Sequence, residues 1–126
     1  LPEEAALRLE RARVEIALAN MQTTNLRVIA AVAGGGAPGV ESSMLKIVGT
    51  EIRQELTSLM RRALGPQALP FPEDALLGDA DGDVAGGGLP EARFAAAHYF
   101  NYRKLSIFGG SNEIQKNIIA KVMLDA

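Results

Sequence analysis

The chain has 126 residues, of which 48% are hydrophobic and 5% aromatic, and its 13 basic and 15 acidic residues leave a formal net charge of −2. This length and composition suit a single domain with an aliphatic core. The near-neutral charge argues against a surface for nucleic acid or for an anionic membrane. The absence of cysteine excludes disulfides and thiolate chemistry, and no apolar run reaches the roughly 18 residues of a membrane span.

One long helix is predicted from residue 2 to residue 33. Its apolar residues recur at helical spacing, namely Leu7, Val14, Leu18, Met21, Val28, Ile29 and Val32. The centre of this helix, NMQTTN at residues 20–25, is polar and poor in helix propensity. We interpret it as a face turned to water or to a neighbouring helix, with a ligand-contacting face as the alternative. Because the chain begins without Met and inside a helical pattern, we expect a piece of a longer protein.

A glycine-rich connection follows at residues 34–39, and its sequence GGGAPG formally satisfies the dinucleotide-binding pattern GxGxxG. That pattern binds phosphate when it follows a strand in a βαβ unit. Here it follows a long helix, and no strand pattern lies nearby. We therefore interpret it as a flexible connection between two helices.

The second helix is predicted from about residue 40 to residue 64. Its apolar stripe consists of Leu45, Val48, Ile52, Leu56, Leu59 and Ala63. Its solvated positions are expected to be Lys46, Glu51, Arg53 and Glu55. Arg61 and Arg62 suit the negative end of the helix dipole, and Gly65 with Pro66 ends the helix.

A long loop is predicted over residues 65–90, which hold most of the prolines of the chain. The acidic run DADGD at residues 79–83 resembles the start of a calcium-binding loop. Val84 and Pro90 stand where such a loop needs glycine and glutamate. We therefore interpret the run as a solvated acidic turn and predict no metal site.

A third helix is predicted from Pro90 to about residue 105. Its inner side is expected to carry Phe94, Ala95, His98, Tyr99, Tyr102 and Leu105. His98 has no cysteine or paired carboxylates beside it, so we interpret it as partly buried and hydrogen-bonded; a metal ligand or a general base is the alternative. The aromatic side chains are interpreted as packing residues, because no basic groove accompanies them as at a base-stacking surface.

The last stretch, FGGSNEIQKNIIAKVMLDA at residues 108–126, joins a glycine turn directly to a helix predicted over residues 111–124. Gly109 and Gly110 permit backbone geometry that other residues resist. Ser111 is a good N-cap, and Glu113 brings a negative charge to the first turn, where the helix dipole favours it. The apolar stripe of this helix consists of Ile114, Ile118 and Val122. Such a turn can hold an anion or a polar edge of a cofactor; a capped terminal helix that packs on the core is the plainer alternative.

Four helices with short or loop connections indicate an all-α fold, an up-and-down four-helix bundle. Within this pattern, the run FGGSNEIQKNIIA from Phe108 to Ala120 resembles the C-terminal signature of the flavin-dependent acyl-CoA dehydrogenases. In that family an aromatic residue, one variable residue, Gly and Thr or Ser precede a helix that opens as EIQRNIIA. The resemblance implies that residues 1–126 are the C-terminal helical bundle domain of such an enzyme. Its specific part is confined to residues 99–126.

The resemblance implies an enzyme that oxidises an acyl-CoA to a trans-2-enoyl-CoA, with the α-hydrogen leaving as a proton and the β-hydrogen as a hydride to FAD. It implies a homo- or hetero-oligomer, dimeric or tetrameric, and an electron-transfer acceptor for the reduced flavin. The chemistry points to fatty acid β-oxidation or to dicarboxylic acyl-CoA breakdown. A cytoplasmic, bacterial-type enzyme is expected, with the mitochondrial matrix as the alternative.

The site residues carry over position by position. Gly109 stands where many members have the catalytic glutamate, while other members have Gly or Ala there and carry the glutamate on an upstream helix. The resemblance therefore implies no side-chain base in this chain, which is not expected to be active alone. It implies that the backbone N–H of Gly109 polarises the thioester carbonyl and that Gly110 lines the thioester pocket. Ser111 and Glu113 match positions that contact the adenine half of FAD.

The resemblance is looser at the end of the second helix. The family carries a Leu-Gly-Gly turn there that reaches the flavin of a neighbouring subunit, whereas this chain has Leu64, Gly65 and Pro66, with Arg62 where glutamine is common. Two other functions fit the sequence as alternatives. One is a non-catalytic or complementary subunit of a heteromeric acyl-CoA dehydrogenase, prompted by Gly109; the other is a stand-alone helical interaction module.

Overall fold

The computed structural model of the chain describes residues 3–73 and 89–125. Within these ranges the α-helices are α1 (Glu3–Ala33), α2 (Glu41–Leu64), α4 (Ala92–Asn101) and α5 (Asn112–Leu124), and two 3₁₀ turns are present, η1 (Gly65–Ala68) and η2 (Tyr102–Ser106). The described residues contain no strand, so the predicted all-α fold is confirmed. The predicted third helix ends early as an α-helix and continues as η2. The acidic run at residues 79–83, and with it most of the predicted loop, lies outside the described residues.

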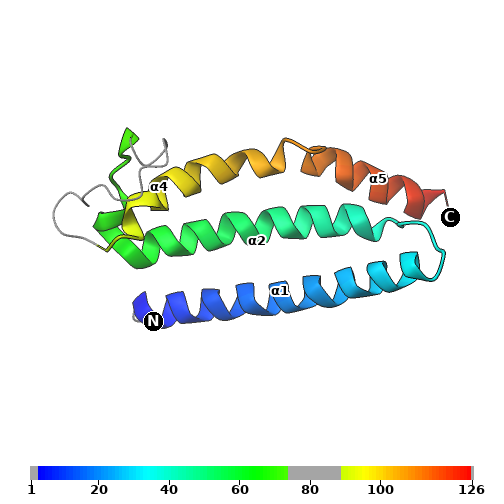
Figure 1. The fold of residues 1–126 in the computed structure, drawn as a ribbon, viewed down its shortest axis with the longest axis horizontal. Coiled ribbons are helices and arrows are strands. Elements are labelled where there is room, and N and C mark those ends of the chain that lie inside the picture. The colour runs from blue at the N-terminus through cyan, green and yellow to red at the C-terminus, as the bar shows by residue number, and fades with distance from the viewer. Residues whose placement is uncertain (1–2, 74–88, 126) are drawn as a thin grey trace.

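Helix α2 is the central element of the fold (Figure 1). It packs against α1 on one side and against α4, η2 and α5 on the other. Helices α4 and α5 follow one another along the same side of α2, so the described helices form three rows (Figure 1). Helix α1 begins at one end of the molecule, and α5 ends at the other. The path is up, down and up again. No described helix combines the length and the apolarity that crossing a bilayer requires.

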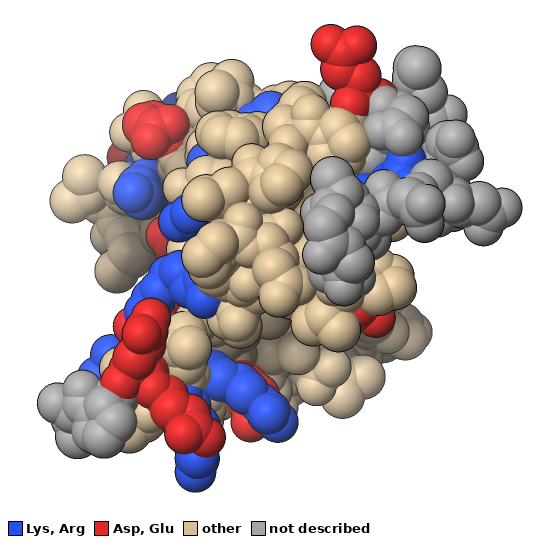
Figure 2. Space-filling view, turned by 90° about the vertical axis from the view of Figure 1, so that its left-hand side faces the viewer, with Lys and Arg blue, Asp and Glu red and all other residues tan. Residues whose placement is uncertain are grey.

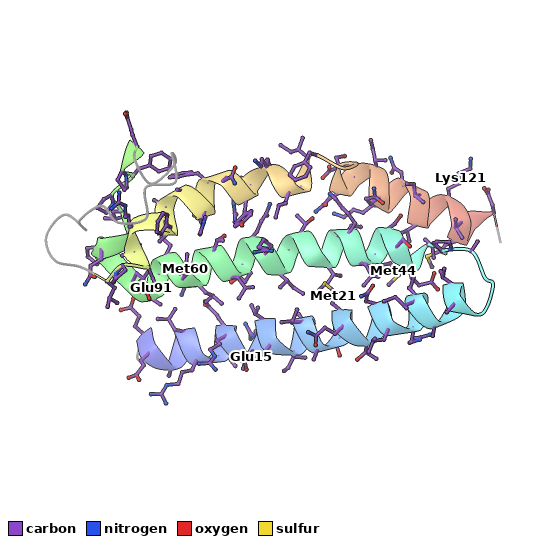
Figure 3. All side chains as sticks on the ribbon, viewed as in Figure 1. Glu15, Met21, Met44, Met60, Glu91 and Lys121 are labelled. Atoms are coloured by element: carbon purple, nitrogen blue, oxygen red, sulfur yellow. The ribbon has the colours of Figure 1, made fainter. Side chains whose placement is uncertain are left out.

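The seam between α1 and α2 contains the aliphatic core. Val14, Ile52 and Leu59 are buried there, and burial of side chains of this size contributes roughly 1.5–3 kcal/mol each. Partly buried neighbours complete the cluster, namely Leu7, Ala17, Leu18, Met21 and Val48. Figure 3 shows Met21, Met44 and Met60 along this seam. The predicted stripe of α1 therefore packs on α2 over its first two thirds, whereas Ile29 and Val32 further along are exposed.

The polar centre of α1 does not interrupt the helix. The hydroxyls of Thr23 and Thr24 donate to the carbonyl oxygens of Ala19 and Asn20, each at 3.0 Å, within the same helix. These bonds satisfy side chains that otherwise compete with the helical backbone. Most of the stretch is exposed, which agrees with the prediction of a polar face turned to water.

Charged side chains gather where α1 begins and α2 ends. Arg62 in the last turn of α2 pairs with Glu10 of α1, while the pairs Arg8–Glu4 and Arg11–Glu15 lie within α1. Figure 2 views this end of the molecule and shows acidic and basic groups side by side on its lower part. Exposed pairs of this kind contribute little to stability. Of these three pairs, which lie within the described part of the chain, the pair of Arg62 and Glu10 joins two helices.

The third row approaches α2 through small side chains. Alanines occupy most of the buried face of α4, at Ala92, Ala95, Ala96 and Ala97. Because these residues take the inner face, His98 lies on a neighbouring row and is exposed, so the prediction of a partly buried histidine is wrong. Its ring stacks on Phe94, with ring centres 6.1 Å apart, and lies 5.8 Å from the ring centre of Tyr102.

Candidate functional site at the Gly109–Gly110 turn

The turn between η2 and α5 depends on two glycines. Gly109 has a φ of 67° and Gly110 a φ of 83°, which is the left-handed region that residues with a Cβ adopt at a cost. A Cβ at Gly109 would meet no atom within 4 Å, so the requirement for glycine there comes from the backbone conformation. A Cβ at Gly110 would come within 2.5 Å of Nε2 of Gln115. The predicted special backbone geometry is present at both positions.

Ser111 caps α5, as predicted. Its backbone is extended, with φ −61° and ψ 158°, and its hydroxyl oxygen accepts the N–H of Ile114 at 3.3 Å. Glu113 lies in the first turn. Its pKa is lowered mainly by a hydrogen bond from its own backbone N–H and then by one from the Ser111 hydroxyl.

The start of α5 therefore carries an ionised carboxylate. The backbone N–H groups of Glu113 and Ile114 already have acceptors within this turn. An anionic ligand would be repelled by Glu113, whereas a ligand hydroxyl or amine could donate to it. Of the two ligand kinds that the sequence allows at this turn, the electrostatics favour the polar edge of a cofactor over an anion.

The turn lies at the surface and offers backbone donors. The N–H groups of Ile107 and Phe108 both donate to the carbonyl oxygen of Lys104, at 2.9 and 3.1 Å. In the part of the chain that the structure describes, the N–H groups of Gly109 and Gly110 have no hydrogen-bond acceptor. Gly109 is exposed and Gly110 is half-buried, so the turn lies at a place that a ligand can reach.

A comparison with protein families decides the relationship. The model of the family described as acyl-CoA dehydrogenase, C-terminal domain, matches residues 1–124 of the chain. The chain belongs to the acyl-CoA dehydrogenase family. The match extends the resemblance seen at residues 108–120 over all described helices. Comparison with curated proteins and with solved structures finds no significant match.

In this acyl-CoA dehydrogenase domain, Lys46 of α2 hydrogen-bonds to residues on both sides of the glycine turn. Its Nζ donates to the carbonyl oxygen of Leu105 at 3.0 Å and to Oδ1 of Asn112 at 2.8 Å. Lys46 is partly buried, so the prediction that it is solvated is wrong. The reason is local: the carbonyls at the end of η2 lack helical partners and need donors from elsewhere.

Two further polar side chains continue this row on α2 at intervals of four residues. The hydroxyl of Thr50 donates to the carbonyl oxygen of Lys46 at 2.8 Å and lies 3.4 Å from that of Leu105. Nε2 of Gln54 donates to the carbonyl oxygens of Tyr102 and Arg103, at 3.1 and 3.3 Å. The sequence signal for this row was a polar residue every fourth position on the side of α2 away from the α1 seam.

The other predicted positions lie elsewhere. The turn formed by Leu64, Gly65 and Pro66 is at the opposite end of α2 from α5 (Figure 1), and Gly65 has a φ of 58°. The structure of one chain therefore does not bring this turn to the Gly109 site.

Tyr99 packs against two arginines, as expected for a packing residue. The guanidinium groups of Arg61 and Arg103 lie over its ring, 4.9 and 4.5 Å from the ring centre.

An apolar groove lies away from the glycine turn, and the described residues offer no metal site. A groove of about 480 Å³ lies between the first half of α1 and the last half of α2, and its walls are mostly apolar, with Leu7, Leu56 and Met60 among them. It lies on the other side of α2 from the glycine turn. Among the described residues, no group of three or more histidine, aspartate or glutamate side chains is placed to hold a metal ion.

Proposed function

We propose that this chain is the C-terminal helical domain of an FAD-dependent acyl-CoA dehydrogenase that oxidises an acyl-CoA to a trans-2-enoyl-CoA. The observation that carries the proposal is the glycine turn, at which the N–H groups of Gly109 and Gly110 lack acceptors among the described residues. When the α-proton of a thioester leaves, negative charge develops on the carbonyl oxygen. Fixed backbone donors lower the energy of that state. The N–H of Gly109 is assigned this role, and Gly110 lines the pocket of the thioester.

The residues at the start of α5 suit one part of FAD. Ser111 and Glu113 would hold its adenine half, because an ionised carboxylate and a hydroxyl accept hydrogen bonds from ribose hydroxyls or from an amine. The lowered pKa of Glu113, due first to its own N–H and then to Ser111, keeps the carboxylate ionised at neutral pH. The phosphates would be repelled there and need donors outside this chain. When bound, FAD supplies the acceptor for the β-hydrogen.

The base that removes the α-proton is assigned to a segment outside this chain. Gly109 has no side chain, and the carboxylate of Glu113 is a weak base because its pKa is lowered by its own backbone N–H and by Ser111. A carboxylate with a pKa raised by burial would be a better base. We place it on an upstream helix of the same polypeptide.

The lack of a side-chain base at Gly109 also favours a second candidate function. If no upstream carboxylate exists, the chain belongs to a complementary subunit of a heteromeric acyl-CoA dehydrogenase, and the partner provides the base. In both cases acyl-CoA is the substrate, an electron-transfer acceptor reoxidises the flavin, and the pathway is fatty acid β-oxidation or dicarboxylic acyl-CoA breakdown. An oligomer is supported by the exposed apolar side chains of α5, among them Ile118, Val122 and Met123.

The test uses the full-length protein encoded by the gene, purified with its flavin. It is titrated anaerobically with a panel of acyl-CoA thioesters while the absorbance of oxidised flavin is recorded. Bleaching by an acyl-CoA, with no bleaching by free CoA, supports the first candidate. A protein that holds FAD and is bleached by no thioester until a second subunit is added supports the second. Absence of bleaching under both conditions contradicts both.

A further inference from the structure

The ammonium group of Lys46 contacts the chain on both sides of the glycine turn. The carbonyl oxygen of Leu105, 3.0 Å away, lies before Gly109 and Gly110 in the sequence, and Oδ1 of Asn112, 2.8 Å away, lies directly after them. Asn112 is buried and is the first residue of α5. One side chain of α2 therefore joins the end of η2 to the start of α5.

This placement differs from the usual behaviour of a lysine at a protein surface. A lysine stem is long enough to carry its charge into water while covering apolar surface. The ammonium of Lys46 instead donates to a backbone carbonyl and to a buried amide, and hydrogen bonds with a charged donor are about twice as strong as neutral ones. A cation is disfavoured at a helix N-terminus, and the carboxylate of Glu113 in the same turn brings an opposite charge near Lys46.

The turn needs such a connection because its own residues restrain it weakly. Two successive glycines have wide conformational freedom, and within the described residues their N–H groups are not bonded to the protein. Thr50 can hold the upstream side, since its hydroxyl lies 3.4 Å from the carbonyl oxygen of Leu105. The downstream side, at Asn112, is joined to α2 by Lys46.

We propose that Lys46 is a positioning residue for thioester oxidation, which holds the Gly109–Gly110 turn in the geometry that its N–H groups need to meet the carbonyl oxygen. This inference rests on the proposed function, because the turn is taken to bind the thioester. The bonds of Lys46 go to Leu105 and Asn112 on either side of the turn, so its proposed effect on the glycine N–H groups passes through these two residues.

The test compares variants of the full-length protein with its flavin. Lys46→Met keeps the length of the side chain and removes the ammonium, and Lys46→Arg retains the charge and the donors. The matched control is Lys116→Met on α5. Lys116 is exposed and interacts with Glu113 as Lys46 does, but it makes neither bond to the turn. The control therefore removes the same charge near the same carboxylate and leaves the connection intact.

For Lys46→Met we expect kcat to fall on the order of 10- to 100-fold, because a misplacement of about 1 Å in a positioned group has effects of that size. KM should change little, since the donors matter most once charge develops on the oxygen. Lys46→Arg should recover most of kcat, and Lys116→Met should keep it. The proposal is wrong if Lys46→Met keeps its kcat, or if Lys116→Met loses as much.

A second variant guards against a simple failure to fold. Asn112→Ala removes the downstream acceptor and leaves Lys46 in place. If both residues act through one contact, the double variant should have a kcat close to that of the worse single variant. Independent, multiplying losses would overturn the proposal.

Amide hydrogen exchange gives a readout that does not depend on activity. The N–H groups of Ile107 and Phe108, bonded to the carbonyl oxygen of Lys104, should exchange faster in Lys46→Met than in the wild type or in Lys116→Met. If the wild type oxidises no acyl-CoA, alone or with a second subunit, the proposed function fails, while faster exchange still supports a positioning role for Lys46 at the turn. Unchanged exchange in Lys46→Met overturns that role whatever the wild type oxidises.

Discussion

Gln54 and Arg103 hydrogen-bond to each other's backbone. Nε2 of Gln54 donates to the carbonyl oxygen of Arg103 at 3.3 Å, and Nη2 of Arg103 donates to the carbonyl oxygen of Gln54 at 2.9 Å. Nε of Arg103 also donates to the carbonyl oxygen of Tyr99 at 3.2 Å. This reciprocal pair joins α2 to the place where α4 tightens into η2. Gln54 lies on the same row of α2 as Lys46, whose ammonium contacts the end of η2 at Leu105.

Replacing Gln54 by leucine should destabilise the chain. The variant keeps the size of the side chain and leaves two partly buried carbonyl oxygens, those of Tyr102 and Arg103, without their donor. We expect the free energy of unfolding to fall by about 1–2 kcal/mol, measured by urea-induced unfolding. Gln22→Leu, at an exposed position of α1, is the control and should change it by less than about 0.5 kcal/mol. Equal effects of the two changes would contradict a role for the pair.

The helices themselves could be predicted because each of them leaves a local pattern. The apolar stripe of α2 and the cap at Ser111 depend on residues three or four positions apart, and such spacing is visible in the sequence. The requirement for glycine at Gly109 and Gly110 was also visible, because two glycines beside an N-cap indicate a turn with special backbone angles. The structure has the predicted helix α2, the cap at Ser111 and the positive φ of both glycines, but Leu56 and Ala63 of the predicted α2 stripe are exposed.

The contacts between rows could not be predicted in the same way. Lys46 lies off the apolar stripe of α2 and is therefore expected in water, whereas its two acceptors, the carbonyl oxygen of Leu105 and Oδ1 of Asn112, come from segments 59 and 66 residues further along the chain. His98 reads as an inner residue because its spacing fits the aromatic stripe, but alanines take the inner face of α4. Both errors arise from pairings between distant segments, which a single helical period does not encode.

Removing the cap of α5 should weaken the helix start. In Ser111→Ala the N–H of Ile114 loses its acceptor, and we expect a loss of about 1 kcal/mol in the free energy of unfolding. Ser42→Ala is the control, because Ser42 is exposed within α2 and alanine is the better helix former. That change should be neutral or slightly stabilising. A similar loss in both variants would argue against a cap at Ser111.

The stability that Glu113 provides should depend on pH. Its pKa is lowered from 4.5, first by its own backbone N–H and then by the Ser111 hydroxyl. A group with a depressed folded pKa stabilises the fold above its unfolded pKa and loses this effect as the pH falls through the folded value. The difference in unfolding free energy between the wild type and Glu113→Gln should therefore be largest at neutral pH and should shrink below pH 4.5.

The cause of this shift can be checked directly. An NMR titration of the Glu113 carboxyl should give a pKa below 4.5 in the wild type and a value closer to 4.5 in Ser111→Ala, because one of the two donors is lost. If the difference in unfolding free energy between the wild type and Glu113→Gln grows on acidification, the ionised carboxylate of Glu113 does not stabilise the fold.

The isolated chain should associate with itself through α5. Ile118 is 43% exposed and Val122 is 50% exposed on the apolar side of this helix, and exposed apolar patches are removed from water by association. We expect Ile118→Gln together with Val122→Gln to lower the apparent molecular mass in light scattering at high concentration. Asn117→Gln, at an exposed position of the same helix, should leave it unchanged. A wild-type chain that stays monomeric at high concentration would count against this prediction.

Two glycine-to-alanine substitutions should have opposite effects on stability. Gly109 has a φ of 67°, and although a Cβ there meets open space, alanine in the left-handed region costs about 1–2 kcal/mol. Gly49 lies inside α2, where a Cβ would come 3.5 Å from the sulfur of Met21, an ordinary contact. Gly49→Ala should therefore raise the free energy of unfolding by roughly 0.5–1 kcal/mol.

Urea-induced unfolding of the two variants separates backbone conformation from available space. Both positions can accommodate a methyl group without a severe clash, so a steric account predicts similar behaviour, whereas a conformational account predicts opposite signs. Gly109→Asn should fall between glycine and alanine, because asparagine tolerates positive φ better than most residues. A stabilising Gly109→Ala would mean that the turn does not hold its left-handed geometry in solution. The assignment of its N–H group to the thioester would then lose its structural basis.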